Sequence, residues 1–169
     1  GLQNIIFTDR KTACYTKHCC CDSSKMVKEH NVHLVIENYS GVPMTYPAAW
    51  FDSGRLADSF EWPSSVSNGQ KLDVLCYEKD WAMAGCSGTI TYTMNNSRVT
   101  FGFSNPSMGT NKLGVGTTGR EVWDNMTNHD YGPFNVLLSI GEVTVTCRCC
   151  CSGGTTNLAT VKIIRDNII

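Results

Sequence analysis

Hydrophobic and polar residues alternate along most of this chain, so that each of several short stretches places its apolar side chains on one face. The apolar positions of the six stretches are Val32, Leu34 and Ile36; Leu72, Val74 and Cys76; Ile90, Tyr92 and Met94; Val99, Phe101 and Phe103; Val143, Val145 and Cys147; and Ala159, Val161 and Ile163. A period of two is typical of a β-strand with one buried face. Polar turn clusters such as Ser40-Gly41 and Asn95-Asn96-Ser97 separate the stretches. Short strands at this spacing predict an all-β fold, a sandwich or barrel.

One segment departs from the alternation. Thr118 is followed three residues later by Glu121, as in a capping box, and then by apolar residues at helical spacing. We therefore expect a short helix near residues 119–128.

The length of 169 residues fits one domain with its own core. No repeat, linker or change of composition divides the chain. We expect one domain over residues 1–169, with a cysteine-rich N-terminal segment at 1–30 and a β-sandwich at 31–169.

Charge and hydropathy exclude some classes of partner. The formal net charge is -1, and acidic and basic residues are interspersed, so we expect no nucleic-acid partner. No stretch has the eighteen or so consecutive apolar residues that a membrane span needs, and the first ten residues lack the pattern of a signal peptide.

Cysteine usage points to an oxidising compartment. The chain has ten cysteines in 169 residues, and Asn38, Asn95 and Asn125 lie in Asn-x-Ser/Thr sequons, which makes them candidates for glycosylation. We therefore expect a secreted protein.

The cysteines gather at the two ends of the chain and favour a disulfide framework. The candidates are Cys14, Cys19, Cys20 and Cys21 in the first cluster, Cys147, Cys149, Cys150 and Cys151 in the second, and Cys76 and Cys86 between them. Pairing between the two clusters would clamp the N-terminal segment onto the last hairpin and would close a long loop, which stabilises by about 4–5 kcal/mol in the chain-entropy model. If Cys147, Cys149 and Cys151 share one strand face, Cys150 points the other way.

Two other roles for the cysteines stay open. Cys14, His18, Cys19 and Cys21 could supply thiolate and imidazole ligands to a metal, although their spacing is not that of a zinc finger. The runs of adjacent cysteines could instead be acylated in a reducing compartment. Disulfides remain the favoured interpretation, so we expect no metal site.

No catalytic motif is present in the sequence. The four histidines are scattered, with no nucleophile or carboxylate placed beside them in a recognisable pattern, and no glycine-rich phosphate loop occurs. We expect neither enzyme activity nor a cofactor.

Several motifs occur in an order and spacing that resemble a known family. They are the segment from Asn38 to Gly54 with its Asn-Tyr-Ser-Gly and Trp-Phe-Asp-Ser-Gly ends, the glycine-flanked Gly85 to Met94, Phe103-Ser104-Asn105-Pro106, Arg120-Glu121-Val122-Trp123, and Pro133-Phe134. Over residues 31–135 this order is similar to that of the actinoporins, the sea-anemone family of membrane-binding cytolysins.

The resemblance implies a β-sandwich that binds phosphocholine headgroups, and then an N-terminal helix that inserts into the target membrane and assembles with neighbouring copies into a pore. The matching headgroup positions are Ser53, Ser87, Ser104, Pro106 and Trp123. An aromatic face suits a choline cation, and serine hydroxyls suit phosphate oxygens. We therefore expect a secreted protein that associates with target-cell membranes.

The sequence departs from the family where the family meets the membrane. The loop after Pro106 lacks the family's tyrosine and tryptophan residues, and residues 13–25 have no apolar stripe of the width that a membrane-surface helix needs. The remaining membrane-contact candidates are Trp81, expected at an exposed loop tip, with Trp50 and Tyr46, although Trp50 is expected in the core rather than in a ligand contact. The alternative is a non-lytic glycan- or protein-binding module, because the fold also resembles that of fungal fruit-body lectins.

Overall fold

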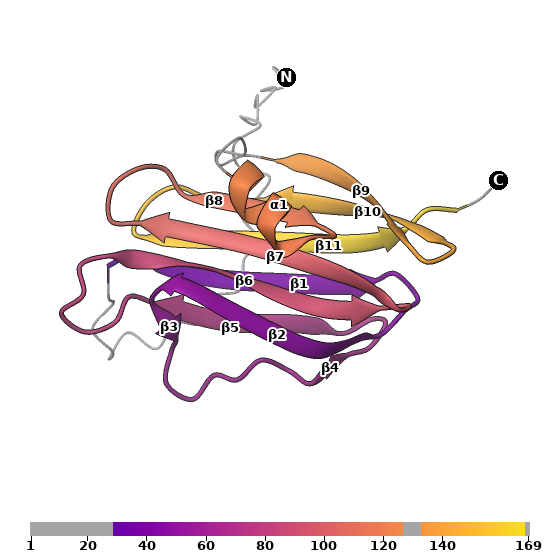
Figure 1. The fold of residues 1–169 in the computed structure, drawn as a ribbon, viewed down its shortest axis with the longest axis horizontal. Helices are drawn as coiled ribbons and strands as arrows, with labels where there is room; N and C mark the ends of the chain where they lie inside the picture. Colours follow the sequence, from indigo (N-terminus) through magenta and orange to yellow (C-terminus); the bar gives the residue numbers. More distant parts are fainter. Residues whose placement is uncertain (1–28, 127–132, 168–169) are drawn as a thin grey trace, which may run out of the picture.

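The computed structural model describes residues 29–126 and 133–167, and these residues form a two-layered β-sandwich with one short helix (Figure 1). The six-stranded sheet contains, in spatial order, β3 (Arg55–Leu56), β5 (Lys71–Tyr77), β1 (Asn31–Tyr39), β11 (Thr156–Arg165), β10 (Val143–Cys150) and β9 (Phe134–Ile140). The five-stranded sheet contains β4 (Ser65–Val66), β2 (Met44–Ser53), β6 (Gly85–Met94), β7 (Ser97–Pro106) and β8 (Lys112–Gly116). The helix is α1 (Gly119–Asn125). The expected β-sandwich is confirmed.

Strand pairing is antiparallel throughout both sheets except at the centre of the six-stranded one. There β1 runs parallel to β11, with Asn31 opposite Thr156 and Tyr39 opposite Ile164. The other neighbour of β1 is β5, so both strands that pair with β1 are distant from it in sequence.

The core lies between the sheets and consists of the predicted alternating residues. All six stretches are strands, and their apolar side chains belong to the buried cluster, except Val143, which is partly buried and packs against it. Tyr92, Phe101 and Phe103 are the largest fully buried side chains. The hydroxyl of Tyr92 donates to the carbonyl of Pro63 at 2.7 Å, and burial raises the pKa of Tyr92 above its ordinary value.

Buried asparagines connect the two sheets at one end. The amide of Asn157 on β11 donates to the carbonyls of Ser104 (2.9 Å) and Lys112 (3.1 Å) on β7 and β8. The amide of Asn105 on β7 donates to the carbonyl of Asn31 on β1 at 2.8 Å. Since a buried amide without partners would be costly, these bonds fix the position of β7 and β8 relative to the six-stranded sheet.

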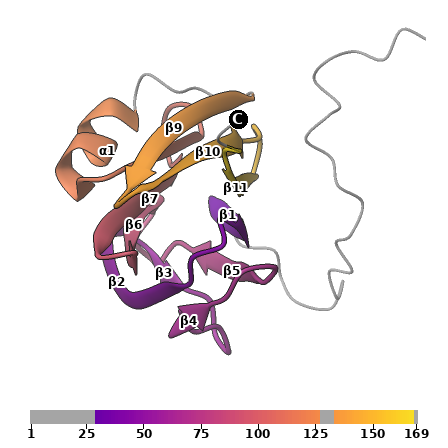
Figure 2. The ribbon, with the colours of Figure 1, turned by 90° about the vertical axis from the view of Figure 1, so that its right-hand side faces the viewer.

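Helix α1 lies on the outer face of the five-stranded sheet (Figure 2). It can approach closely because a Cβ at Gly102 would lie 2.8 Å from Cγ1 of Val122. The helix was expected from the sequence, but the capping box is not formed: Thr118 is the N-cap, yet its side chain makes no capping hydrogen bond. Residues 127 and 128 of the expected helix lie outside the described residues.

The sequons differ in burial. Asn38 is fully buried, and its amide donates to the carbonyls of Val42 (2.8 Å) and Val66 (2.9 Å). The folded chain therefore uses Asn38 to fix a turn, which argues against its modification. Asn95 and Asn125 are exposed and stay candidates.

The cysteines of the second cluster mostly face the core. Cys147, Cys149 and Cys151 belong to the buried cluster, whereas Cys150 does not, as alternation along β10 requires. Cys147, Cys149 and Cys151 carry free thiols, and burial raises the pKa of Cys147 to about 12. The four cysteines of the first cluster lie outside the described residues, so the clamp, the metal site and acylation stay predictions.

Within residues 29–126 and 133–167, no helix is long and apolar enough to cross a membrane.

Candidate functional site

A row of polar side chains crosses the outer face of the five-stranded sheet. The strand register places Ser53 of β2 opposite Ser87 of β6, Ser87 opposite Ser104 of β7, and Ser104 opposite Lys112 of β8. Opposite residues of antiparallel strands project from the same face. Three hydroxyls and one ammonium group therefore lie in line across four strands; we name this set the hydroxyl row.

The centre of the hydroxyl row is a hydrogen-bonded pair. The Oγ atoms of Ser87 and Ser104 are 2.7 Å apart, and each residue is only 6 % exposed. One of the two hydroxyl protons is used within the pair, whichever atom donates, and the other can be donated to a ligand. Ser53 and Lys112 at the ends of the row are half-buried. The row can therefore donate several hydrogen bonds to a small anionic group, with one positive charge beside it.

An aromatic pair lies beside the hydroxyl row. Trp50 of β2 is opposite Thr89, two residues along β6 from Ser87, which is about 7 Å in a strand. Its ring packs edge-on against that of Trp123 on α1, with centroids 4.9 Å apart and planes at 87°. Trp50 is 48 % exposed, so it is not a core residue. The pair thus offers an accessible aromatic surface to a cation.

Two apolar loop tips adjoin the same end of this sheet. Gly85 pairs with Pro106, so the loop before β6 and the loop after β7 leave the sheet side by side, at the left in Figure 1. Trp81 and Met83 in the first loop are 99 % and 85 % exposed, and Met108 in the second is 89 % exposed. Both residues of the first loop have positive φ (66° and 48°), an uncommon conformation outside glycine. We name these three side chains the apolar tip.

The sequence-predicted residues largely come together. Ser53, Ser87 and Ser104 form the hydroxyl row, Pro106 ends β7 next to the apolar tip, and Trp123 packs on Trp50. The exposure expected for Trp81 is confirmed.

Tyr46 does not join them. It is 80 % exposed, but it follows Thr45, which lies opposite Thr93 at the other end of β6. Lys112 was not predicted from the sequence, because its place depends on the register of β8. Met83 and Met108 were not predicted either, because the only signal in their loops is the apolar residues themselves.

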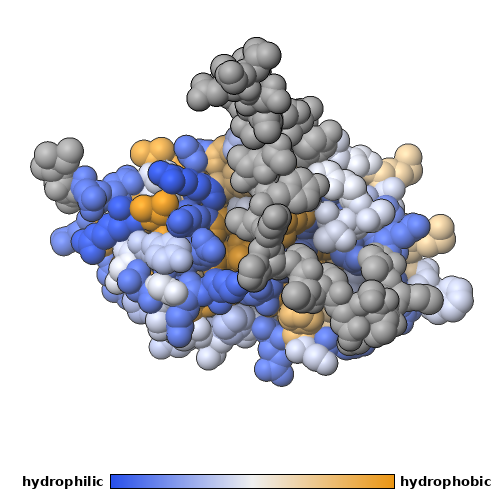
Figure 3. Space-filling model, turned by 180° about the vertical axis from the view of Figure 1, so that it is seen from behind, coloured by the Kyte–Doolittle hydropathy of each residue, from blue (hydrophilic) through white to orange (hydrophobic). Residues whose placement is uncertain are grey.

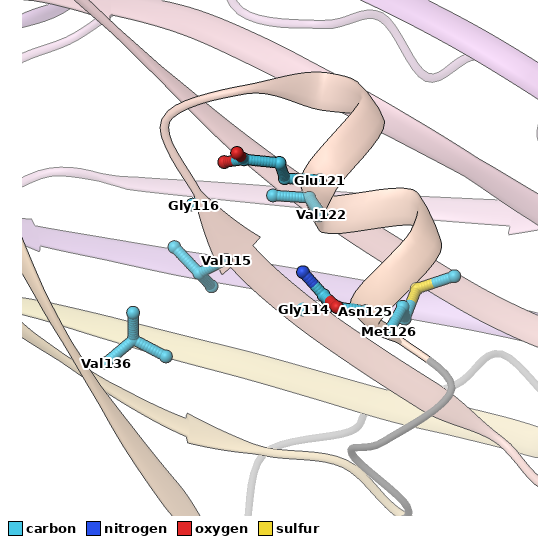
Figure 4. Close-up of a pocket in the computed structure, with 8 residues that line it drawn as sticks. All are labelled: Gly114, Val115, Gly116, Glu121, Val122, Asn125, Met126 and Val136. Atoms are coloured by element: carbon cyan, nitrogen blue, oxygen red, sulfur yellow. The ribbon is translucent and has the colours of Figure 1, made fainter.

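A pocket of about 400 Å³ lies on the other side of α1 (Figure 4). Its lining residues are Gly114, Val115, Gly116, Glu121, Val122, Asn125, Met126 and Val136. The side chains of Glu121 and Asn125 point from the helix toward β8, so a carboxylate and an amide meet an apolar wall. Such a combination can bind a ligand with several hydroxyl groups.

Figure 3 shows the molecule from behind, where hydrophilic and hydrophobic residues are both exposed. Charged side chains of the six-stranded sheet interact there: Nε2 of His33 lies 2.7 Å from Oδ1 of Asp73, and Nζ of Lys71 lies 3.7 Å from Oδ2 of the same carboxylate. None of the ring–ring contacts among the described residues lies on this face.

Comparisons with known proteins find the same fold in several solved structures. No protein-family model and no curated protein sequence matches the chain. Among solved structures, the lipid-binding protein Nakanori is similar with a TM-score of 0.64 at 21 % identity, over 84 % of this chain and 73 % of that one. The protein IP-1A from Alcaligenes faecalis matches with a TM-score of 0.52 at 8 % identity, over 85 % and 96 %. The lectin XCL from Xerocomus chrysenteron matches with a TM-score of 0.50 at 13 % identity, over 80 % and 97 %. At these identities the likeness shows the fold alone.

Proposed function

We propose that this protein binds lipid headgroups on a membrane surface through the outer face of its five-stranded sheet. The observation that carries the proposal is the hydroxyl row, with Lys112 at one end and the Trp50–Trp123 pair beside it. A zwitterionic choline phospholipid has the matching chemistry, a phosphate next to a quaternary ammonium group.

In the proposed complex the phosphate oxygens accept hydrogen bonds from the hydroxyl row, and Lys112 balances their charge. The choline cation, one short linker away, lies against the tryptophan pair, where the ring quadrupole attracts it. Because the distance of about 7 Å between the two parts is similar to the length of such a headgroup, one lipid can reach both.

The apolar tip favours a membrane surface, rather than a soluble ligand, as the binding partner. Tryptophan is enriched at membrane interfaces, and methionine adapts its shape to an irregular apolar surface. Trp81, Met83 and Met108 are exposed at the same end as the hydroxyl row. They can enter the interface while the row meets the headgroups. The similar fold of a protein described as lipid-binding agrees with this proposal.

Vesicle sedimentation tests the headgroup proposal. We expect binding to vesicles of phosphatidylcholine or sphingomyelin and weaker binding to vesicles of phosphatidylethanolamine. Trp123→Ala should weaken binding to choline vesicles about tenfold or more, since a desolvated cation–π contact is worth about 2 kcal/mol. Lys112→Gln should weaken it several-fold.

Lys71→Gln is the matched control, because Lys71 is an exposed lysine on the other sheet, and it should bind as the unmodified protein does. Equal binding to all headgroups, or no vesicle binding at all, would refute the proposal.

Pore formation and assembly with copies of the chain are a further step that we propose only as a consequence of binding. Dye leakage from the same choline vesicles separates the two: binding without leakage would leave a non-lytic lipid-binding protein. We also propose secretion, on the cysteine content alone.

A second candidate function is glycan binding in the pocket beside α1. Glu121 and Asn125 can bind sugar hydroxyls there. On a glycan array we expect saturable binding that Glu121→Gln weakens about tenfold or more, because hydrogen bonds to a charged group are worth about 1.5–3 kcal/mol. Asp124→Asn on the same helix, outside the pocket lining, should change nothing. An array without any saturable signal would exclude this candidate.

A further inference from the structure

The two sheets meet at a corner where the chain crosses from one to the other. Ser53 ends β2 opposite Ser87 of the five-stranded sheet, and three residues later Leu56 on β3 is opposite Cys76 of the six-stranded sheet. Between them, Gly54 touches both sheets: a Cβ on it would lie 2.8 Å from the carbonyl oxygen of Tyr77 and 2.9 Å from Sγ of Cys86. The C-terminal end of β5 and the N-terminal end of β6 therefore lie close together at this corner.

Two cysteines face each other inside the corner. Cys76 on β5 and Cys86 on β6 are both fully buried and carry free thiols. The thiol of Cys76 is hydrogen-bonded to that of Cys86, and this contact together with burial raises the pKa of Cys76 far above its ordinary value. They come from different sheets, so a bond between them would join the two layers.

The other buried thiols lack this arrangement. Cys147 and Cys149 lie two residues apart on one face of β10, and the thiol of Cys149 is directed to the carbonyl of Cys147 at 3.6 Å. The thiol of Cys151 contacts Oδ1 of Asn157 at 3.2 Å. Within the described residues, Cys76 and Cys86 are thus the pair of free thiols that meet from opposite sheets.

We propose that Cys76 and Cys86 form a disulfide between the two sheets when the protein folds in an oxidising compartment, and that the structure describes the reduced form of this site. Two S–H bonds break and one S–S bond forms. The two electrons and two protons pass to a disulfide oxidant, such as glutathione disulfide or the active-site disulfide of an oxidoreductase, which is reduced to two thiols.

The burial of the pair determines when the bond can form. Exchange requires a thiolate that an oxidant can reach. Both side chains are fully buried in the closed sandwich, and the pKa of Cys76 is raised. Oxidation therefore precedes closure of the corner. Once made, the bond is equally inaccessible to reductants.

Peptide mapping tests the proposal directly on the unmodified sequence. Trypsin cleaves after Lys71, Lys79 and Arg98, so Cys76 and Cys86 fall in peptides 72–79 and 80–98, each with a single cysteine. After folding in a mixture of reduced and oxidised glutathione, unfolding and alkylation of free thiols, we expect these two peptides to be recovered linked. Reduction should separate them. Recovery of both peptides in the alkylated form, or linked to other cysteines, would overturn the proposal.

Thermal unfolding supplies a second readout. Reduction under denaturing conditions and refolding without oxidant should lower the Tm of the unmodified protein by about 5–10 °C more than that of a Cys76→Ala/Cys86→Ala variant, because a disulfide typically stabilises by about 2–4 kcal/mol. Cys147→Ala/Cys149→Ala is the matched control. This variant should still yield the linked peptides, and reduction should lower its Tm as much as that of the unmodified protein. Equal decreases in all three proteins would contradict a bond between the sheets.

Discussion

Replacing Trp81 and Met83 together by serine should reduce binding to choline-lipid vesicles about 10- to 100-fold without changing the Tm. The two side chains are 99 % and 85 % exposed, so the fold gains almost nothing from them. In contact with a membrane, burial of a large apolar side chain contributes about 1.5–3 kcal/mol, and about 1.4 kcal/mol corresponds to a factor of ten in affinity. Incomplete burial in the interface keeps the expected loss below the sum for two full burials. Vesicle sedimentation together with a thermal melt measures both quantities.

Two other exposed hydrophobic residues provide matched controls. Leu137 on β9 is 68 % exposed and Tyr46 on β2 is 80 % exposed, and neither adjoins the apolar tip. Leu137→Ser and Tyr46→Ser should bind vesicles as the unmodified protein does. If these controls weaken binding as much as the loss of Trp81 and Met83, the membrane contact is not at the tip.

Gly54→Ala should destabilise the fold by about 3 kcal/mol or more. Gly54 has φ +84°, a conformation that costs other residues about 1 kcal/mol or more, and an added Cβ would lie 2.8 Å from a backbone carbonyl oxygen. That backbone cannot move away without separating β3 from β5, since Tyr77 pairs with Arg55 there. The free energy of unfolding from urea denaturation measures the effect.

Gly69 separates the two causes of this cost. It has nearly the same φ, +83°, but no atom lies within 4 Å of the place of its Cβ. Gly69→Ala should therefore cost only about 1 kcal/mol. A similar cost for both substitutions would mean that the close approach at the corner contributes nothing.

The strands could be predicted from the sequence because burial on one face leaves a period of two. Val99, Phe101 and Phe103 alternate with Thr100 and Gly102, and the three apolar side chains are buried between the sheets. The helix was also found, although the hydrogen bond expected at Thr118 is absent. Alternation indicates which face of a strand packs in the core, so it was sufficient to predict an all-β fold.

The site could be predicted only in part, because alternation does not say which strands are neighbours. The alignment of Ser104 with Lys112 depends on the register of β7 and β8. The exposure of Trp50 depends on β2, where the register shifts between Thr45 and Ala48 break the simple period. The serines were recognised through the resemblance of their motifs, whereas Lys112 and the apolar tip required the folded chain.

The parallel pairing of β1 with β11 has a consequence for synthesis on the ribosome. β1 lies at the centre of the six-stranded sheet, and one of its two neighbours is the last strand of the described chain. Until residues 156–165 have left the exit tunnel, β1 has an unpaired edge, and Val32, Leu34 and Ile36 lack part of their packing. A nascent chain that presents such an edge is prone to aggregate. The six-stranded sheet can therefore be completed only after residues 156–165 have been synthesised and released, although β1 is the first strand of the described chain to be made.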